Sequence, residues 1–454
     1  MIKNKVKEFV RERKDEIVAT LMELIKIPSV STDREACYKM LLAVKSLYEK
    51  HGFDVIEGDD YLLAYYGEGE TEIGLFAHGD VVDGGENWLI TSPFDPKIYN
   101  GAIVGRGAWD DKSAIVCSLY TLLALKELNI PMNKRMVCFT GFNEENGMSD
   151  IVKYIKSNTP PDFSFVLDAG FPVYYGDKGK AWLRATSKNK CSDIIDFCGG
   201  KMINITLGNA EARLAYSKEL YDSLTETQKV KITKEDNEIV IRATGVSSHG
   251  ANPEGSVNGG FLIADMLRSS DALSQSDREI MNSLATVLRS YYGETVGIAN
   301  DDKEFGKLTL TNGIIEIKDR KLRFTLDMRF GKAAKMENSL QILKKSLDDL
   351  GFDLEIINAD DAYSVDTENE YLKKYLEAFR SYTGEKDAAM RINAGSTYAR
   401  CIGNACETGM RYKGTYLDLP SGHGYAHQPD ENIGIDGLLN AIEIIIYAMI
   451  KINE

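Results

Sequence analysis

The chain has 454 residues, of which 43% are hydrophobic and 27% charged, and its formal net charge is −15. This length exceeds one compact core, so two or three domains are expected, and the charge disfavours nucleic acid and membranes as partners. The seven cysteines are scattered, odd in number and without CxxC spacing, which predicts free thiols in a cytoplasmic protein.

The N-terminal segment predicts a helix rather than a signal peptide. Its apolar residues recur at helical spacing, at Phe9, Ile17, Leu21, Leu24 and Ile25, and it lacks the apolar core of a leader.

Strands and helices alternate from there to about residue 181. The sequence predicts strands at 73–77, 135–142 and 163–170, and helices at 114–130 and 151–158. Such alternation is typical of an α/β domain with a central mixed, mostly parallel sheet flanked by helices.

The pattern changes at about residue 182. Period-2 stretches predict antiparallel strands at 237–250 and 307–330, and longer apolar periods predict helices at 259–273 and 338–352. We therefore expect an inserted α+β domain at 182–375, which divides the first domain into 1–181 and 376–454.

The final segment returns to helices, at 370–384 and 437–452. The second of these is the longest apolar run, but it contains Glu443 and is short for a membrane span. We expect it to be a packed C-terminal helix.

Potential metal ligands follow three of the predicted strands. They are His78 and Asp80, then Glu144 and Glu145, then Asp168. Ligands of open α/β sheets bind beyond the carboxyl ends of the strands, so these groups are expected to converge. The stretch VGRGAWDDKS adds Asp110 and Asp111 just before the predicted helix 114–130.

Each of these fragments alone has an ordinary structural explanation. An HxD pair is more often a satisfied polar pair than two ligands, Asp-Asp before a helix is usually a cap, and Glu-Glu after a strand is usually a solvated turn. The chain has only five histidines, however, and His78, His249 and His427 lie in glycine- or proline-flanked segments. A mixed histidine and carboxylate set is what a pair of divalent ions requires.

The spacing of these residues suggests roles for two of the acids. In an extended chain His78 and Asp80 share a face, so the Asp80 carboxylate can accept the second imidazole N–H and orient the ring. Glu144 and Glu145 should lie in a turn, where one can bind metal while its neighbour acts as a general base.

Six motifs together resemble a known family. They are HGDVVDGGENW, GRGAWDDKS, TGFNEENG, FVLDAGFPVYYGDKG, SSHGANPEGSVNG and HQPDE. The resemblance is to the two-metal zinc peptidases and deacylases that include carboxypeptidase G, the aminoacylases, succinyl-diaminopimelate desuccinylase and the dipeptidases. The chain length, the insertion and FPVYYGDKG are most similar to the dipeptidase V group, the Xaa-His or carnosine-type dipeptidases.

The resemblance implies two Zn²⁺ ions per chain, with Mn²⁺ or Co²⁺ as alternatives. One ion would be held by His78, Asp110 and Asp168, and the other by Asp110, Glu145 and His427. Asp110 would bridge the ions, and its peptide bond to Asp111 is expected to be cis.

The same resemblance assigns the catalytic steps. Asp80 supports His78, and Glu144 is the general base for a metal-bridged hydroxide.

The resemblance also implies substrate contacts. His249 would stabilise the oxyanion, and Arg329 would bind the substrate's terminal carboxylate, although its ordinary reading is a solvated surface residue. Asn204, Gly395 and Ser396 match substrate-contacting positions.

Three stretches depart from the family pattern, at Asn143, Ser113 and 205–209. None of these departures removes a ligand or the base, so we expect an active enzyme. The sequence does not determine which substrate it prefers. The predicted function is hydrolysis of small dipeptides by a monomer, with a dimer as the alternative. The rivals are an N-acyl amino acid deacylase and a non-catalytic binding protein, whereas GRGAWDDKS fits no nucleotide-binding motif.

Overall fold

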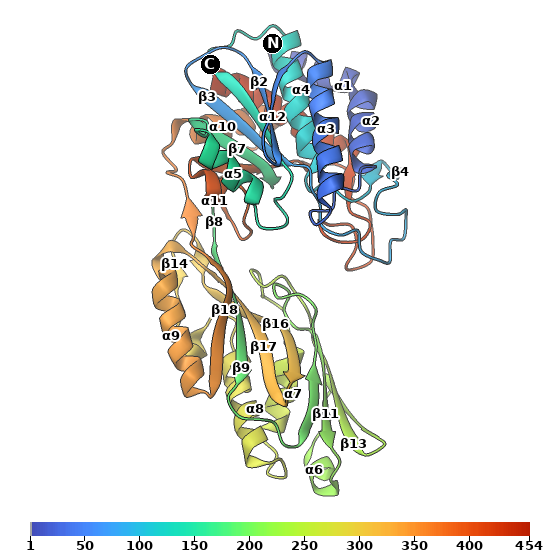
Figure 1. The fold of residues 1–454 in the computed structure, drawn as a ribbon, viewed down its shortest axis with the longest axis vertical. Helices are drawn as coiled ribbons and strands as arrows, with labels where there is room; N and C mark the ends of the chain where they lie inside the picture. The colour runs from blue at the N-terminus through green and yellow to red at the C-terminus, as the bar shows by residue number, and fades with distance from the viewer. Residues whose placement is uncertain (1) are drawn as a thin grey trace. The chain divides into compact units, whose positions relative to one another are not determined.

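The computed structural model describes residues 2–454, which form two compact units (Figure 1). Unit 1 comprises the chain up to Asp177 together with 364–454, and unit 2 comprises 178–363. The sequence predicts an insertion at 182–375, and this domain division stays a prediction. The boundaries of unit 2 differ from those of the predicted insertion. The strand β9 (Gly179–Ser187) pairs within unit 2, whereas the helix α10 (Glu370–Thr383) packs in unit 1.

Unit 1 is built on a nine-stranded mixed sheet. Its strand order is β1 (Asp54–Glu57), β2 (Tyr61–Tyr66), β6 (Arg135–Gly141), β3 (Glu72–His78), β7 (Phe163–Ala169), β21 (Ala405–Gly409), β8 (Tyr174–Asp177) and β19 (Tyr363–Ser364), and β20 (Arg391–Asn393) pairs with β8. The central strands β6, β3, β7 and β21 are mutually parallel. The predicted α/β class is therefore confirmed, and the carboxyl ends of these four strands lie at one edge of the sheet.

The helices of unit 1 cover this sheet. They are α1 (Ile2–Glu12), α2 (Lys14–Ile25), α3 (Arg34–Lys50), α4 (Lys112–Glu127), α5 (Ser149–Ser157), α10, α11 (Ala399–Ile402) and α12 (Ile435–Asn453). Every residue of α4 from Lys112 to Leu125 is buried, because the helix packs against β3 on one side and against α2 and α12 on others. A small sheet of β4 (Lys97–Tyr99), β5 (Ala102–Val104) and β22 (Asn432–Gly434) completes the unit.

Unit 2 contains two four-stranded antiparallel sheets. One has the order β10 (Ile194–Cys198), β11 (Asn209–Ala215), β13 (Glu238–Thr244), β12 (Val230–Glu235), and the other β16 (Thr309–Lys318), β17 (Lys321–Phe330), β9, β18 (Phe352–Asp360). The remaining elements are α6 (Lys218–Ser223), α7 (Gly259–Leu267), α8 (Gln275–Leu288), η1 (Glu294–Val296), β14 (Asp301–Asp302), β15 (Gly306–Lys307), η2 (Lys332–Ala334) and α9 (Met336–Asp349). Both sheets and α7, α8 and α9 share one apolar core.

The C-terminal helix α12 is packed, as the sequence predicts. It contacts α1, α4 and α10, and its buried Glu443 accepts hydrogen bonds from Arg11 Nε at 2.6 Å and Tyr382 Oη at 2.7 Å. Within residues 2–454, no helix has the length and apolar character needed to cross a bilayer. The cysteines are free, in agreement with the prediction from their spacing.

Candidate metal centre

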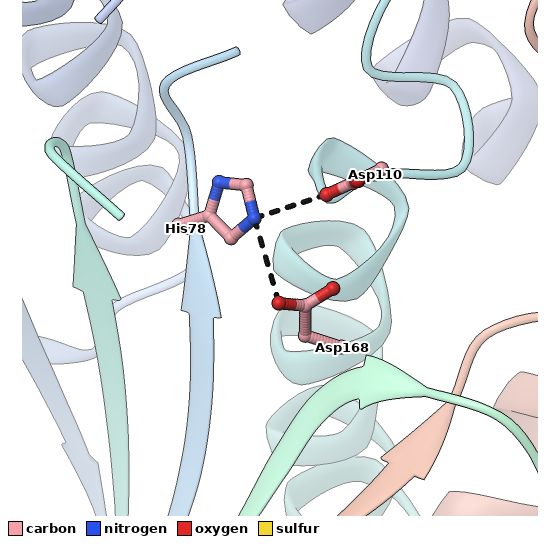
Figure 2. A group of neighbouring side chains, drawn as sticks. All are labelled: His78, Asp110 and Asp168. Carbon is pink, nitrogen blue, oxygen red and sulfur yellow. Dashed lines mark hydrogen bonds and ion pairs between the residues drawn. The ribbon is translucent and has the colours of Figure 1, made fainter. Parts of the chain in front are cut away.

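Three segments of unit 1 bring the first group of candidate ligands together (Figure 2). His78 is the last residue of β3, Asp168 lies at the end of β7, and Asp110 lies two residues before α4. Nε2 of His78 is 3.1 Å from Oδ1 of Asp110 and 3.8 Å from Oδ2 of Asp168. Parallel strands and a helix start therefore aim three potential ligands at one point.

A second group shares Asp110 with the first. Oδ2 of Asp110 is 3.1 Å from Nε2 of His427, which is also 3.0 Å from Oε1 of Glu145. In each group the potential ligand atoms lie within 4.8 Å of one another. The two carboxylate oxygens of Asp110 thus face different histidines, an arrangement that suits a bridging ligand.

The charge and chemistry of these groups fit divalent cations. Six carboxylates and two histidines lie close together at the site. The carboxylates are those of Asp80, Asp110, Asp111, Asp168, Glu144 and Glu145. Burial raises the pKa of Asp168, Asp111 and Glu145, and neighbouring carboxylates add to this effect. The pKa of Asp110 is lowered, despite its burial, by hydrogen bonds to His427 and His78. Bound divalent cations would neutralise this excess of negative charge, and histidine and carboxylate are ligand types common to zinc sites.

The support of His78 by the Asp80 carboxylate stays a prediction. Nδ1 of His78 lies 2.9 Å from the backbone carbonyl oxygen of Asp80 and 3.5 Å from its Oδ1. The carboxylate also accepts hydrogen bonds from the Ser31 hydroxyl at 2.7 Å and from the backbone N–H groups of Glu144 and Glu145 at 3.0 and 3.2 Å. Asp80 therefore links the histidine to the turn that carries the two glutamates.

Glu144 and Glu145 lie in a turn after β6, as predicted. Glu144 is buried, and its pKa is raised well above its usual value by burial and by the nearby charges of Asp168, Glu145 and Asp80. The peptide bond between Asp110 and Asp111 is cis, as the resemblance implies.

A buried ion pair that the sequence reasoning missed organises the loop before Asp110. Glu431 is fully buried and lies 2.6 Å from Arg106, and its Oε1 also accepts the backbone N–H groups of Gly107, Trp109 and Asp110 at 3.0–3.1 Å. The only signal for Glu431 was its place at the end of HQPDE, a motif that suggested His427 alone.

Asp430 and Lys112 hold neighbouring segments. Asp430 accepts the backbone N–H groups of Leu89 and Ile90, and its Oδ2 is 2.7 Å from Nδ1 of His423. Lys112 donates from Nζ to the carbonyl oxygens of Leu24 and Ile27, and burial lowers its pKa to about 7.

A cavity of about 390 Å³ lies beside the first group of ligands, within unit 1. Its wall includes Asp110 and Asp168 together with Trp109, Tyr174 and Asn393. A small molecule in this cavity would therefore lie directly against two candidate ligands and against aromatic and amide side chains.

The remaining predicted residues are distributed over both units. Gly395 and Ser396 lie in unit 1, in the loop between β20 and α11, whereas Asn204, His249 and Arg329 belong to unit 2. Arg329 is 4% exposed and donates to Asp327 Oδ1 at 2.8 Å, so it is no solvated surface residue.

The unit 2 residues are close neighbours. The backbone carbonyl of Asn204 accepts the N–H of Gly250 at 2.7 Å, next to His249. Burial lowers the pKa of His249, and the charge of Arg329 lowers it further.

Comparisons with known proteins assign the chain to a family. The sequence profile of peptidase family M20/M25/M40 matches residues 74–451. The chain belongs to this family. It is accordingly a metallopeptidase, as the resemblance implies.

Relatives and solved structures of similar extent support the assignment. This M20 peptidase is 26% identical to a Staphylococcus haemolyticus protein named "Putative dipeptidase", over 98% of each chain. Its fold is similar to that of human carnosine dipeptidase 1, with a TM-score of 0.62 and 14% identity over 100% of this chain and 99% of the other. The aminoacylhistidine dipeptidase of Vibrio alginolyticus has a TM-score of 0.56 and 13% identity over 96% of both chains.

Proposed function

We propose that this M20 peptidase is a dipeptidase with two metal ions, normally Zn²⁺. The observation that carries the proposal is Asp110, whose two carboxylate oxygens face His78 and His427 in two separate ligand groups. A single structural ion pair would need only one such histidine. The names of the sequence relatives support a dipeptide substrate.

The residues present would hold the metals in two sets. His78, Asp110 and Asp168 would bind one ion, and Asp110, Glu145 and His427 the other. When bound, such ions polarise a carbonyl group and lower the pKa of water. Mn²⁺ or Co²⁺ could replace zinc in sites so rich in carboxylates.

The side chains would carry the proton transfers. Glu144 would accept a proton on its carboxylate from the attacking water and later deliver it to the amine nitrogen of the leaving amino acid. Its position beside both ligand groups, in the turn held by Asp80, supports this role. His249 would donate a hydrogen bond to the developing oxyanion.

Four further residues would contact the substrate. Arg329 would bind the C-terminal carboxylate, which would limit substrates to short peptides. Asn204, Gly395 and Ser396 would contact the substrate backbone. A monomeric assembly and a cytoplasmic location complete the proposal.

A panel of matched substrates tests this function. Free dipeptides and their N-acetylated forms would be compared with the zinc-loaded and the manganese-loaded enzyme. Hydrolysis of the free dipeptides, and not of the acetylated ones, is the expected result. Hydrolysis of the acetylated compounds alone would assign the chain to the N-acyl amino acid deacylases instead.

A further inference from the structure

The loop from Asn393 to Thr397 borders the cavity beside the metal centre. It connects β20 to α11 and contains the predicted substrate contacts Gly395 and Ser396. Asn393 itself lines the cavity together with Asp168. The conformation of this loop therefore affects where the Asn393 side chain lies in the cavity wall.

One buried carboxylate holds both ends of the loop. Glu407 is fully buried on β21, where its Oε2 accepts a hydrogen bond from Asn393 Nδ2 and its Oε1 accepts one from Thr397 Oγ1, each at 2.6 Å. Inside the loop, Asn393 Oδ1 accepts the N–H of Gly395 at 3.0 Å. The amide of Asn393 is thus oriented by two hydrogen bonds, one of which it donates to the buried Glu407 carboxylate.

A second acid and an arginine extend this contact. Asp177, fully buried at the end of β8, is a close electrostatic neighbour of Glu407, and Arg400 Nε lies 3.5 Å from Asp177 Oδ2. A buried carboxylate is costly unless its oxygens are bonded. Both oxygens of Glu407 accept hydrogen bonds from side chains at the ends of the loop, Asn393 at the end of β20 and Thr397, and the Glu407 carboxyl group also shares a hydrogen bond with Asp177. Glu407 therefore joins the loop to the sheet.

We propose that Glu407 is a positioning residue that clamps the Asn393–Thr397 loop and so orients Asn393 in the cavity beside Asp168. The part of this inference that concerns substrate binding rests on the proposed function. The hydrogen bonds by which Glu407 holds the loop do not depend on which substrate the protein binds.

The kinetic test uses Glu407→Leu, which removes both acceptors, and Glu407→Gln, which retains one. Glu443→Leu is the matched control, because Glu443 is equally a buried glutamate of unit 1 with two side-chain donors. Glu407→Leu is expected to raise KM about tenfold with kcat nearly unchanged, and Glu407→Gln to raise it less. Glu443→Leu should lower Tm and leave KM unchanged. Unchanged KM in Glu407→Leu, or an equal KM rise in the control, would overturn the clamp.

A double-mutant cycle tests whether Glu407 acts through Asn393. Asn393→Ala should raise KM about as much as Glu407→Leu, and the double variant should be no worse than Asn393→Ala alone. Effects that multiply would show that Glu407 acts by another route and would contradict the inference.

Amide hydrogen exchange separates the clamp from the proposed function. Residues 391–400 should exchange at least about tenfold faster in Glu407→Leu than in the parent chain, and not in Glu443→Leu. If the parent chain hydrolyses no substrate of the panel, the proposed function fails and this exchange result alone decides the clamp. Unchanged exchange in that segment would overturn it.

Discussion

Asp110 is the residue on which both candidate metal sites depend. Its Oδ1 faces His78 and its Oδ2 faces His427, at 3.1 Å in each case. Asp168 and Glu145 each belong to only one group. A change at Asp110 should therefore affect two ions, whereas a change at Asp168 should affect one.

Metal content distinguishes these two acids. We expect Asp110→Asn to lose both metal equivalents and Asp168→Asn to retain about one, because an amide is a poor substitute for an ionised ligand. Elemental analysis after dialysis measures this directly. Equal retention of metal by the two variants would rule out Asp110 as the bridge.

The proposed general base, Glu144, can be tested by a substitution that removes its charge. Glu144→Gln should lower kcat by about 10²–10⁴-fold, because a general base is lost, while metal content stays that of the parent chain. Steady-state kinetics together with metal analysis check it, with Glu443→Gln as a control, because Glu443 does not line the cavity. A variant that keeps most of its activity would remove Glu144 from the proton transfers.

Single residues were predictable where a motif fixed their place in the chain. The HxD after a strand, the Asp-Asp before a helix and the Glu-Glu after a strand named the residues that the structure brings together. The role of the Asp80 carboxylate was less predictable. Its nearest partners, Ser31 and the amides of the 144–145 turn, are distant in the sequence and have no local signature.

At the scale of elements, the loop before α4 is held by a buried ion pair and by backbone hydrogen bonds to one of its members. Arg106 and Glu431 form an ion pair with exposures of 2% and 0%, and Glu431 accepts three backbone N–H groups of the loop. The loop thus takes its shape from a residue more than 300 positions later in the chain.

Glu431→Gln should lower the free energy of unfolding by about 3 kcal/mol, because Arg106 would keep a buried charge without its partner. Metal affinity should fall about 10- to 100-fold, as for other residues that support ligands. Chemical denaturation and metal titration provide the two readouts. Glu127→Gln is a suitable control, since the Glu127 side chain is 43% exposed and its pair with Arg13 should contribute little. A Glu431→Gln chain as stable as this control would contradict the account.

Elements were predictable where apolar periodicity was strong. β3, β6, β7, α4 and α12 all lie within a few residues of the positions that the sequence indicated. The small sheet of β4, β5 and β22 was not predicted, because its strands have three residues each and pair across the chain.

At the scale of the whole molecule, the chain divides into two units with separate cores. The apolar core of unit 2 consists of residues from within 178–363. Lys180 and Asp360 are paired on the adjacent strands β9 and β18, so both ends of unit 2 leave it side by side.

We therefore expect residues 178–363 to fold alone. The isolated segment should unfold cooperatively on heating and should bind no zinc, since all candidate ligands lie in unit 1. Calorimetry and zinc titration check both points. The companion chain, with 178–363 replaced by a short glycine-serine linker, should bind zinc without hydrolysing dipeptides, because His249 and Arg329 would be missing. Zinc binding by the isolated segment would contradict the assignment of all metal ligands to unit 1.

The change in periodicity near residue 182 is the sequence signal for an inserted α+β domain, which stays a prediction. The edges of unit 2 have no such signal, because β8 and β9 follow each other with one residue between them and give no break in composition.

Metal-dependent hydrolysis by this chain is tested most directly by measuring metal content and hydrolysis in one preparation. The zinc-loaded parent chain and its Glu144→Gln variant would be analysed for bound zinc and assayed on free dipeptides. We expect about two zinc ions in both chains, with hydrolysis in the parent chain alone. A parent chain that binds no zinc after loading, or a variant that hydrolyses dipeptides as fast as the parent, would contradict it.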